Sequence, residues 1–375
     1  MNVFDYLTWR CDVPLSVSPF NPVDNLVFSE LAYTDLTGIV PADGTEIPLS
    51  EACARFFETH DREEIKARTA YTAPAPFLME SMLAGCRFRD VKLCYYVTVM
   101  DREDTAQFAA LTCLLPDGTA YVSFRGTDGT VVGWKEDFML SYRSGTRGQQ
   151  LAADYLQRVA DGLALPLRVG GHSKGGNFAV YAAVLSGPEI RSRITEVWTN
   201  DGPGFREEVR SLPAYREIMA KTISVVPDTS IIGLLLTNDC TRRVVRSTNT
   251  GIAQHDGFSW ETGPVDFVPG ELSRRGEYVE RTISDWVARQ NDETLQSLVD
   301  SAFRIIEAPG EDSFHAMTAR KLKTAEVMML AVRALPREKQ KELLQATGQL
   351  FQSTGSTARE LIAPARTSQE DAGSE

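Results

Sequence analysis

The chain of 375 residues is poor in the side chains that build metal sites and disulfide frameworks. It contains only four histidines and six cysteines, and no two of its cysteines form a Cys-x-x-Cys pair. This scarcity argues against a structural zinc site and against disulfide staples.

Long apolar runs are also missing. No stretch approaches the ~20 apolar residues that a membrane-spanning helix needs. The first ten residues lack the basic segment followed by an apolar segment that marks a signal peptide. We therefore expect a cytoplasmic protein with no membrane span.

Basic residues are the scarcer charged class, with 39 Lys and Arg against 51 Asp and Glu, which gives a net charge of −12. A chain this acidic is a poor candidate for binding nucleic acid or anionic membranes by bulk electrostatics. Its hydrophobic and charged fractions, 43% and 24%, are those of an ordinary globular protein. A chain of this length buries a sizeable core without disulfides.

The middle of the chain alternates between strand-like and helix-like segments. Residues 91–99, 106–114 and 120–124 are apolar, β-branched and aromatic, and a Pro-Asp-Gly turn separates the last two. From residue 147 to residue 247, amphipathic helical patterns alternate with further short strands. Alternation of this kind predicts an α/β fold with a mostly parallel central sheet and helices on both faces.

The segments outside this alternation have a different character. From about residue 270 the apolar residues recur at helical spacing, and the last dozen residues are polar. We therefore predict an N-terminal arm with helices packed on the core, an α/β core, a helical extension and a disordered tail, over residues 1–85, 86–268, 269–363 and 364–375.

The segment most indicative of chemistry is Gly171-His-Ser-Lys-Gly175, a Gly-x-Ser-x-Gly pattern. It follows an apolar strand and precedes a helix rich in small residues, the context of a nucleophile elbow. Glycines on either side of Ser173 let the strand and the helix approach each other without Cβ clashes. The alternative interpretation is a tight strand-to-helix turn with no catalytic role.

A serine nucleophile needs a histidine base, and four histidines compete for that role. His172 adjoins the serine and is interpreted as structural. His60 and His315 lie in helical flanks, where histidines are more often surface residues. His255 lies in a loop after the last core strand, and it preserves the order Ser, acid, His, so we predict it as the base.

Two aspartates lie after strands between Ser173 and His255. Asp228 ends one predicted strand and Asp201 ends the strand before it. Either carboxylate is able to orient the imidazole, and the alternative for each is a turn or capping aspartate. The residue pattern leaves both candidates open.

An oxyanion hole needs backbone N–H groups aimed at the developing charge. The N–H of Lys174, directly after the serine, is one candidate. The other comes from the strand over residues 121–127, which ends in a glycine-bounded turn.

Three of these patterns together resemble the class 3 triacylglycerol lipases: Phe124-Arg-Gly-Thr127, Trp134 followed by Asp137, and the Gly-His-Ser-x-Gly-Gly segment. The resemblance implies an α/β-hydrolase fold, Thr127 as an oxyanion donor and Asp228 as the acid. We therefore prefer Asp228 and keep Asp201 as the second choice. Lys174 stands where these lipases usually have Leu.

The chain looks closer still to an uncharacterised bacterial family of predicted α/β-hydrolases. It shares with that family the segments Phe4-Asp-Tyr-Leu-x-Trp, Asp24-Asn-Leu-Val-x-Ser-Glu-Leu-Ala-Tyr and Gln254-His-Asp-x-Phe-Ser-Trp. The resemblance covers roughly residues 1–265 and leaves the C-terminal helices unassigned.

These observations predict a serine hydrolase that cleaves a carboxylic ester, of a small molecule or a lipid, through an acyl-enzyme and without metal or organic cofactor. The apolar run over residues 231–236 either lines an acyl pocket or belongs to the core. Alternative functions are hydrolysis of small thioesters or peptides, and a catalytically silent scaffold whose C-terminal helices bind a protein partner.

Overall fold

The computed structural model describes the whole chain except for several short segments and the C-terminal tail. The residues it leaves out are 69, 231, 234, 274–275, 277–281, 283–285, 288, 314–320 and 354–375, and for 321–323 and 347–353 it describes only the backbone. His315, part of the 231–236 run and the predicted disordered tail therefore lie outside the described residues.

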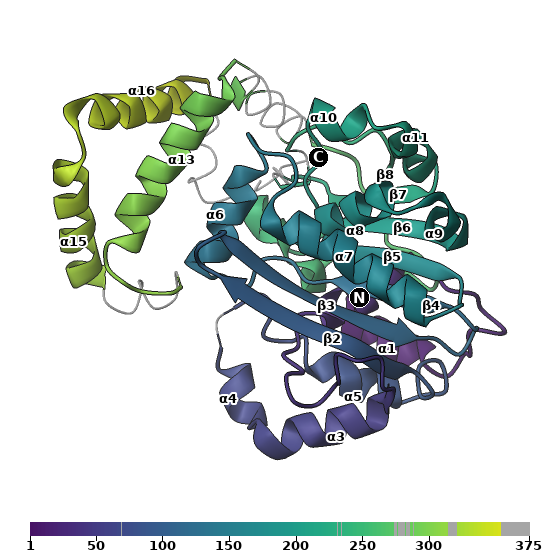
Figure 1. Cartoon of the computed structure of the whole chain (residues 1–375). Coiled ribbons are helices and arrows are strands. Elements are labelled where there is room, and N and C mark those ends of the chain that lie inside the picture. Colours follow the sequence, from purple (N-terminus) through teal and green to yellow (C-terminus); the bar gives the residue numbers. More distant parts are fainter. Residues whose placement is uncertain are drawn as a thin grey trace, which may run out of the picture.

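The centre of the molecule is an eight-stranded sheet whose strands follow one another in chain order (Figure 1). Pairing is antiparallel from β1 to β4 and parallel from β4 to β8. The strands are β1 (Ile47–Pro48), β2 (Lys92–Asp101), β3 (Ala106–Leu114), β4 (Ala120–Phe124), β5 (Leu167–His172), β6 (Ile194–Asn200), β7 (Thr222–Pro227) and β8 (Thr241–Val245).

Helices cover both faces of this sheet, and the predicted α/β-hydrolase fold with a helical extension is confirmed. The N-terminal helices are α1 (Val3–Arg10), α2 (Pro22–Leu31), α3 (Leu49–Thr59), α4 (Arg62–Lys66) and α5 (Phe77–Leu83). Those between the strands are α6 (Val131–Met139), α7 (Arg147–Gly162), α8 (Lys174–Leu185), α9 (Pro188–Arg193), α10 (Glu207–Arg210) and α11 (Pro213–Met219). After β8 come the 3-10 turns η1 (Gly251–His255) and η2 (Gly257–Ser259), then α13 (Asp292–Glu307), α15 (Lys321–Ala334) and α16 (Arg337–Ser353).

The central strands β3 to β7 are largely buried on both faces, so they divide their side chains between two cores. On β3, Leu111 packs with the N-terminal helices, whereas Ala110 packs with α7 and α8. The same alternation separates Tyr121 from Val122 on β4 and is the two-residue period of a strand. Figure 1 shows α7 and α8 crossing one face of the sheet, with α1 on the other.

The N-terminal arm is tied to the sheet through α2 and β1. All residues of α2 except Pro22 are buried, and Asp24 forms a fully buried ion pair with Arg87. Strand β1 lies within the predicted arm and pairs with β2, so this arm contributes an edge strand as well as covering helices.

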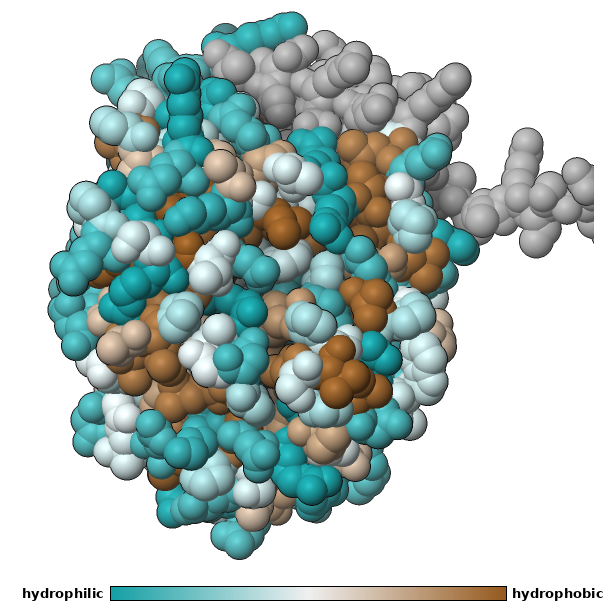
Figure 2. Space-filling model, turned by 90° about the vertical axis from the view of Figure 1, so that its right-hand side faces the viewer, coloured by the Kyte–Doolittle hydropathy of each residue, from teal (hydrophilic) through white to brown (hydrophobic). Residues whose placement is uncertain are grey.

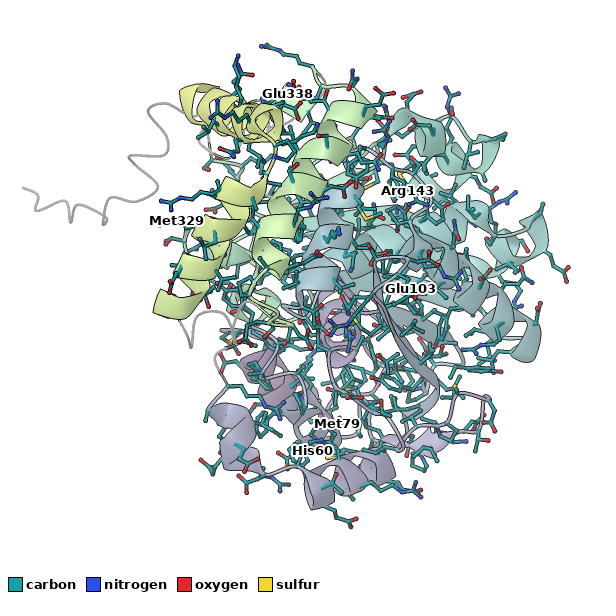
Figure 3. All side chains as sticks on the ribbon, turned by 60° about the vertical axis from the view of Figure 1, so that its left-hand side comes forward. His60, Met79, Glu103, Arg143, Met329 and Glu338 are labelled. Carbon is teal, nitrogen blue, oxygen red and sulfur yellow. The ribbon has the colours of Figure 1, made fainter. Side chains whose placement is uncertain are left out.

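The C-terminal helices meet the α/β core through α6. Phe303 of α13 lies in a small apolar cluster with Val131 of α6, and its ring packs edge-on against that of Phe138. Helices α15 and α16 then pack on α13, which places them at the outer side of the extension (Figure 1). Met329 lies on the side of α15 that faces away from the sheet (Figure 3) and is 56% exposed.

Ending the chain after residue 268 is expected to give an aggregating product. The truncation strips α13 from α6 and exposes the apolar face that includes Val131 and Phe138. Exposed contiguous apolar surface drives association. Size-exclusion chromatography of the truncated chain tests this expectation, and a monomeric, active product would show that α13 is a separate module.

One face of the molecule is mixed in character. On the face shown in Figure 2, apolar side chains lie in small patches between hydrophilic ones. Within the described ranges, no helix combines the length and the apolar character needed to cross a bilayer.

Candidate active site

Ser173 stands at the sharp turn between β5 and α8. Its φ of 58° lies in the left-handed region, which residues other than glycine rarely adopt and which is often retained for function. The turn is possible because Gly171 and Gly175 lack side chains. A Cβ on Gly175 would lie 2.0 Å from the carbonyl oxygen of Phe124 on β4.

The His255 ring lies between Ser173 and a carboxylate. Its Nε2 is 2.9 Å from Ser173 Oγ, and its Nδ1 is 2.6 Å from Asp201 Oδ2. Because a carboxylate only accepts, Nδ1 carries the proton and Nε2 presents its lone pair to the serine hydroxyl. This tautomer is the one that a general base requires.

Asp201 follows β6 and is fully buried, with a φ of 49° that is also left-handed. Its second oxygen, Oδ1, accepts hydrogen bonds from the Gly233 N–H at 3.1 Å and from the Ser230 hydroxyl. These donors hold the carboxylate and leave Oδ2 for the histidine.

The prediction that Asp228 faces the histidine is wrong, and the second choice, Asp201, occupies that place. Asp228 Oδ1 instead accepts a hydrogen bond of 2.5 Å from the amide of Gln254, the residue before His255. The Gln254 side chain also accepts from the Thr229 N–H at 2.9 Å. Asp228 therefore supports the loop that carries the histidine without touching its ring.

Strand order explains why Asp201 is closer. Strand β6 is the direct neighbour of β5, with His172 level with Asn200, so Ser173 and Asp201 leave the sheet side by side. Strand β7 is one position further away, and Asp228 follows its last residue. Neighbouring strands lie about 4.8 Å apart, so the imidazole ring reaches a residue that follows the adjacent strand but not one that follows the strand beyond it.

His172 is hydrogen-bonded to the loop that carries His255. Its Nε2 donates to the His255 carbonyl oxygen at 2.7 Å, and its Nδ1 accepts from the Tyr33 hydroxyl at 2.9 Å. Burial and the neighbouring His255 keep the pKa of His172 well below its ordinary value, so the ring is neutral. Its structural interpretation agrees with these contacts. His60 stacks on Phe56 at the end of α3, at the opposite end of the molecule from α13 in Figure 3.

The loop after β4 lies directly against the serine turn. A Cβ on Gly126 would approach the His172 carbonyl oxygen to 2.5 Å and the Ser173 Cβ to 3.0 Å. Thr127, the residue after Gly126, therefore lies close to the serine turn. Its hydroxyl donates to Asp137 Oδ2 at 2.6 Å. Lys174 occupies the first position of α8, where a backbone N–H has no acceptor within its own helix.

Burial raises the pKa of the Asp137 carboxyl to about 6, although nearby Lys174 and the hydrogen bond from Thr127 act to lower it. The ordinary value is near 3.8, so folding favours the protonated acid. The stabilising contribution is complete below about pH 4 and is lost as the pH rises through about 6.

Asp137→Asn is therefore expected to gain stability relative to the natural chain as the pH rises from 4 to 7, by about 2 kcal/mol in the free energy of unfolding. Asparagine stays neutral and keeps an acceptor for Thr127. Urea unfolding of both chains at several pH values measures the difference. Asp256, whose pKa burial also raises to about 6, titrates in both chains and cancels. Parallel stability curves would contradict the prediction.

A cavity of about 460 Å³ opens beside the histidine loop. Asp256, the residue after His255, forms part of its wall, and the remaining wall is largely aromatic and apolar, with two cationic side chains. The other lining residues are Phe4, Lys66, Arg68, Ala70, Tyr71, Ala73, Pro74 and Phe77. Within the described ranges, no cluster of three or more His, Cys, Asp or Glu side chains suits a metal ion.

Sequence reasoning missed two residues of this site. Tyr33 lies in the quoted segment 24–33 but received no role, and its contact with His172 joins positions 139 residues apart. Glu136 received no role either, yet it is fully buried and pairs with Lys174. No local signal marked it, because Glu136 lies between Lys135 and Asp137 in a run of three charged residues.

The eight-stranded sheet with helices on both faces, with serine, histidine and aspartate in hydrogen-bond contact at its edge, places this protein in the class of α/β-hydrolase folds. The chain belongs to the Mbeg1-like family, whose model matches residues 82–304, more than half of the sequence. A search of curated proteins finds no match.

Among solved structures, the chain is similar to several lipases. A Rhizomucor miehei lipase propeptide complex matches with 15% identity and a TM-score of 0.35, over 48% of this chain and 71% of that one. Lipase II from Rhizopus niveus matches with 18% identity and a TM-score of 0.30, over 50% and 77%. M37 lipase matches with 14% identity and a TM-score of 0.34, over 63% and 80%.

Proposed function

We propose that the chain is a serine hydrolase that cleaves a carboxylic ester through an acyl-enzyme intermediate. The observation that carries the proposal is the His255 ring, with Nε2 at 2.9 Å from Ser173 Oγ and Nδ1 at 2.6 Å from Asp201 Oδ2. Hydroxyl, imidazole and carboxylate in this order are the parts of a serine-hydrolase triad.

In the first half-reaction, Ser173 Oγ bonds to the ester carbonyl carbon while its proton passes to His255 Nε2. The ester C–O bond then breaks, and His255 returns the proton to the departing alkoxide, which leaves as an alcohol. In the second half-reaction, water gives a proton to His255 as its oxygen bonds to the acyl carbon. The bond from that carbon to Ser173 Oγ then breaks, and His255 returns the proton to Oγ, which releases the acid and restores the serine. Asp201 holds the Nδ1–H and stabilises the imidazolium throughout.

The negative charge on the carbonyl oxygen needs donors beside Ser173. We assign this role to the backbone N–H groups of Lys174 and Thr127, supported by the position of Lys174 at the start of α8 and by the contact of Gly126 with the serine turn. Loss of one donor in such a site typically costs about 10²–10³ in kcat.

The cavity beside Asp256 supports an ester with an apolar portion as the substrate, since its walls are mainly apolar and aromatic. An apolar group entering it would leave water and gain about 25 cal/mol per Å² of buried apolar surface.

Two measurements on the full chain test the proposal. A fluorophosphonate probe is expected to label the protein, with peptide mapping placing the adduct on Ser173. p-Nitrophenyl esters from acetate to long-chain acids are expected to be hydrolysed. Preference for the shortest esters would favour a small ester, thioester or peptide as substrate. Neither labelling nor turnover would instead favour a catalytically silent scaffold that binds a protein partner.

A further inference from the structure

The Lys174 side chain is completely buried beneath the serine turn, a rare position for a lysine. Its ammonium group donates to Glu136 Oε2 at 2.9 Å, to Gln107 Oε1 at 3.2 Å and to the Gly133 carbonyl oxygen at 3.4 Å. These three acceptors use all three of its N–H groups.

Its partner Glu136 is fully buried as well and is equally well satisfied. Besides the lysine, Oε2 accepts from the Gln107 N–H at 3.1 Å. The other oxygen accepts from the Thr146 hydroxyl at 3.1 Å and from the Gly148 N–H at 2.8 Å. The cluster therefore has no free donor or acceptor for a ligand, and its role has to lie in what it holds together.

The pair links the two segments to which we assign the oxyanion donors. The backbone of Lys174 follows Ser173, whereas its side chain reaches the first turn of α6 at Gly133. Gln107, which also contacts the ammonium, donates from its amide to the Gly126 carbonyl oxygen at 3.5 Å. The adjacent helical residue, Asp137, accepts from the Thr127 hydroxyl. Helix α6 is thus fixed to the serine turn by Glu136 and to the Thr127 loop by Asp137.

We propose that the buried Lys174–Glu136 ion pair is a positioning device that sets the distance between the two oxyanion donors of the serine hydrolase. The inference rests on the proposed function, because the distance matters only if an oxyanion forms there. Donors must lie about 2.7–3.1 Å from the oxyanion, and a displacement of about 1 Å costs about 10²-fold in rate. The opposite charges compensate each other, so the pair acts through geometry and not through net charge.

The double variant Lys174→Met/Glu136→Gln tests this role. Methionine keeps the length of the side chain, and glutamine keeps an acceptor for Gly148, so no unpaired charge is left buried. We expect kcat for p-nitrophenyl esters to fall about 10²-fold, with KM changed less than about threefold. Affinity for a trifluoromethyl ketone, which mimics the tetrahedral state, is expected to fall in parallel with kcat.

A matched control is a second fully buried ion pair, Arg87–Asp24, whose hydrogen bonds join Tyr6, Val13 and Ser18 of the N-terminal arm. Arg87→Met/Asp24→Asn is expected to lower Tm while leaving kcat and KM unchanged at a temperature where the chain is folded. If the Lys174 double variant does not fold, Glu136→Asp serves in its place. This single variant keeps both charges and draws the carboxylate back by one methylene, and we expect a loss of about tenfold in kcat.

A folded Lys174 or Glu136 variant with the kcat of the natural chain would overturn the inference, whatever its Tm. A natural chain that neither hydrolyses esters nor reacts with the fluorophosphonate is a different result. It would overturn the proposed function, and the positioning role would fall with it.

Discussion

Replacing Ser173 by alanine is expected to lower kcat for ester hydrolysis about 10⁶-fold, the loss typical of a triad without its nucleophile. The hydroxyl lies 2.9 Å from His255 Nε2, and its removal leaves the imidazole with no group to activate. Alanine removes a single oxygen, so the fold should persist. Alanine and serine both carry a Cβ, so the left-handed backbone conformation at this position is equally strained in both chains.

Initial rates with a p-nitrophenyl ester, together with circular dichroism, measure this effect. Ser186 is a matched control, since it is also a buried serine at an end of α8 and lies at the far end from the elbow. Ser186→Ala should retain the rate of the natural chain. Near-natural turnover by a folded Ser173→Ala chain would remove the whole catalytic assignment.

Asp201→Asn is expected to lower kcat about 10⁴-fold, the cost of losing the orienting carboxylate in a model serine protease. Asparagine presents an amide that no longer fixes the proton on His255 Nδ1, so the ring adopts the tautomer that directs N–H towards the serine. In the natural chain, Asp201 is fully buried and its Oδ2 lies 2.6 Å from His255 Nδ1. Substrate binding should be little affected, because Asp201 lies behind the imidazole.

Asp228→Asn is the comparison that separates the two aspartates. Asparagine keeps an oxygen able to accept from Gln254, so kcat should change less than about threefold and the free energy of unfolding by at most about 1 kcal/mol. Steady-state kinetics on both variants, with Tm as the check on folding, decide between them. An inactive Asp228→Asn chain beside an active Asp201→Asn chain would reverse the assignment.

The elbow was predictable from the sequence because its requirements are local. Gly171, Ser173 and Gly175 are neighbours along the chain, and the strand and helix around them have clear apolar patterns. The alternation between residues 147 and 247 likewise predicted β5 to β8 to within a few residues, since parallel buried strands and covering helices follow from hydrophobic period. Helix α9 was missed because six residues after Gly187 carry too short a pattern to register.

The choice of acid was not predictable in the same way. Asp201 and Asp228 both follow strands, and residue patterns do not say which strand lies next to β5. Sheet order is decided by how all the strands and helices pack together, and here it runs in chain order, which places β6 beside the elbow. Asp228 follows a strand one position further from the elbow than Asp201 does, a difference of about 4.8 Å. This difference is enough for Asp201 to reach the imidazole and for Asp228 to miss it.

The sequence by itself determined the α/β pattern and the serine turn, because each depends on residues close together in the chain. It singled out His255 as the candidate base because few histidines compete and this one follows the last core strand. Only the tertiary structure decided the partner of the histidine, the contact of Tyr33 with His172 and the burial of Lys174 against Glu136. These contacts join residues 38 to 139 positions apart. Their energies depend on burial and on distances of a few ångströms, which are set when the sheet and its covering helices pack.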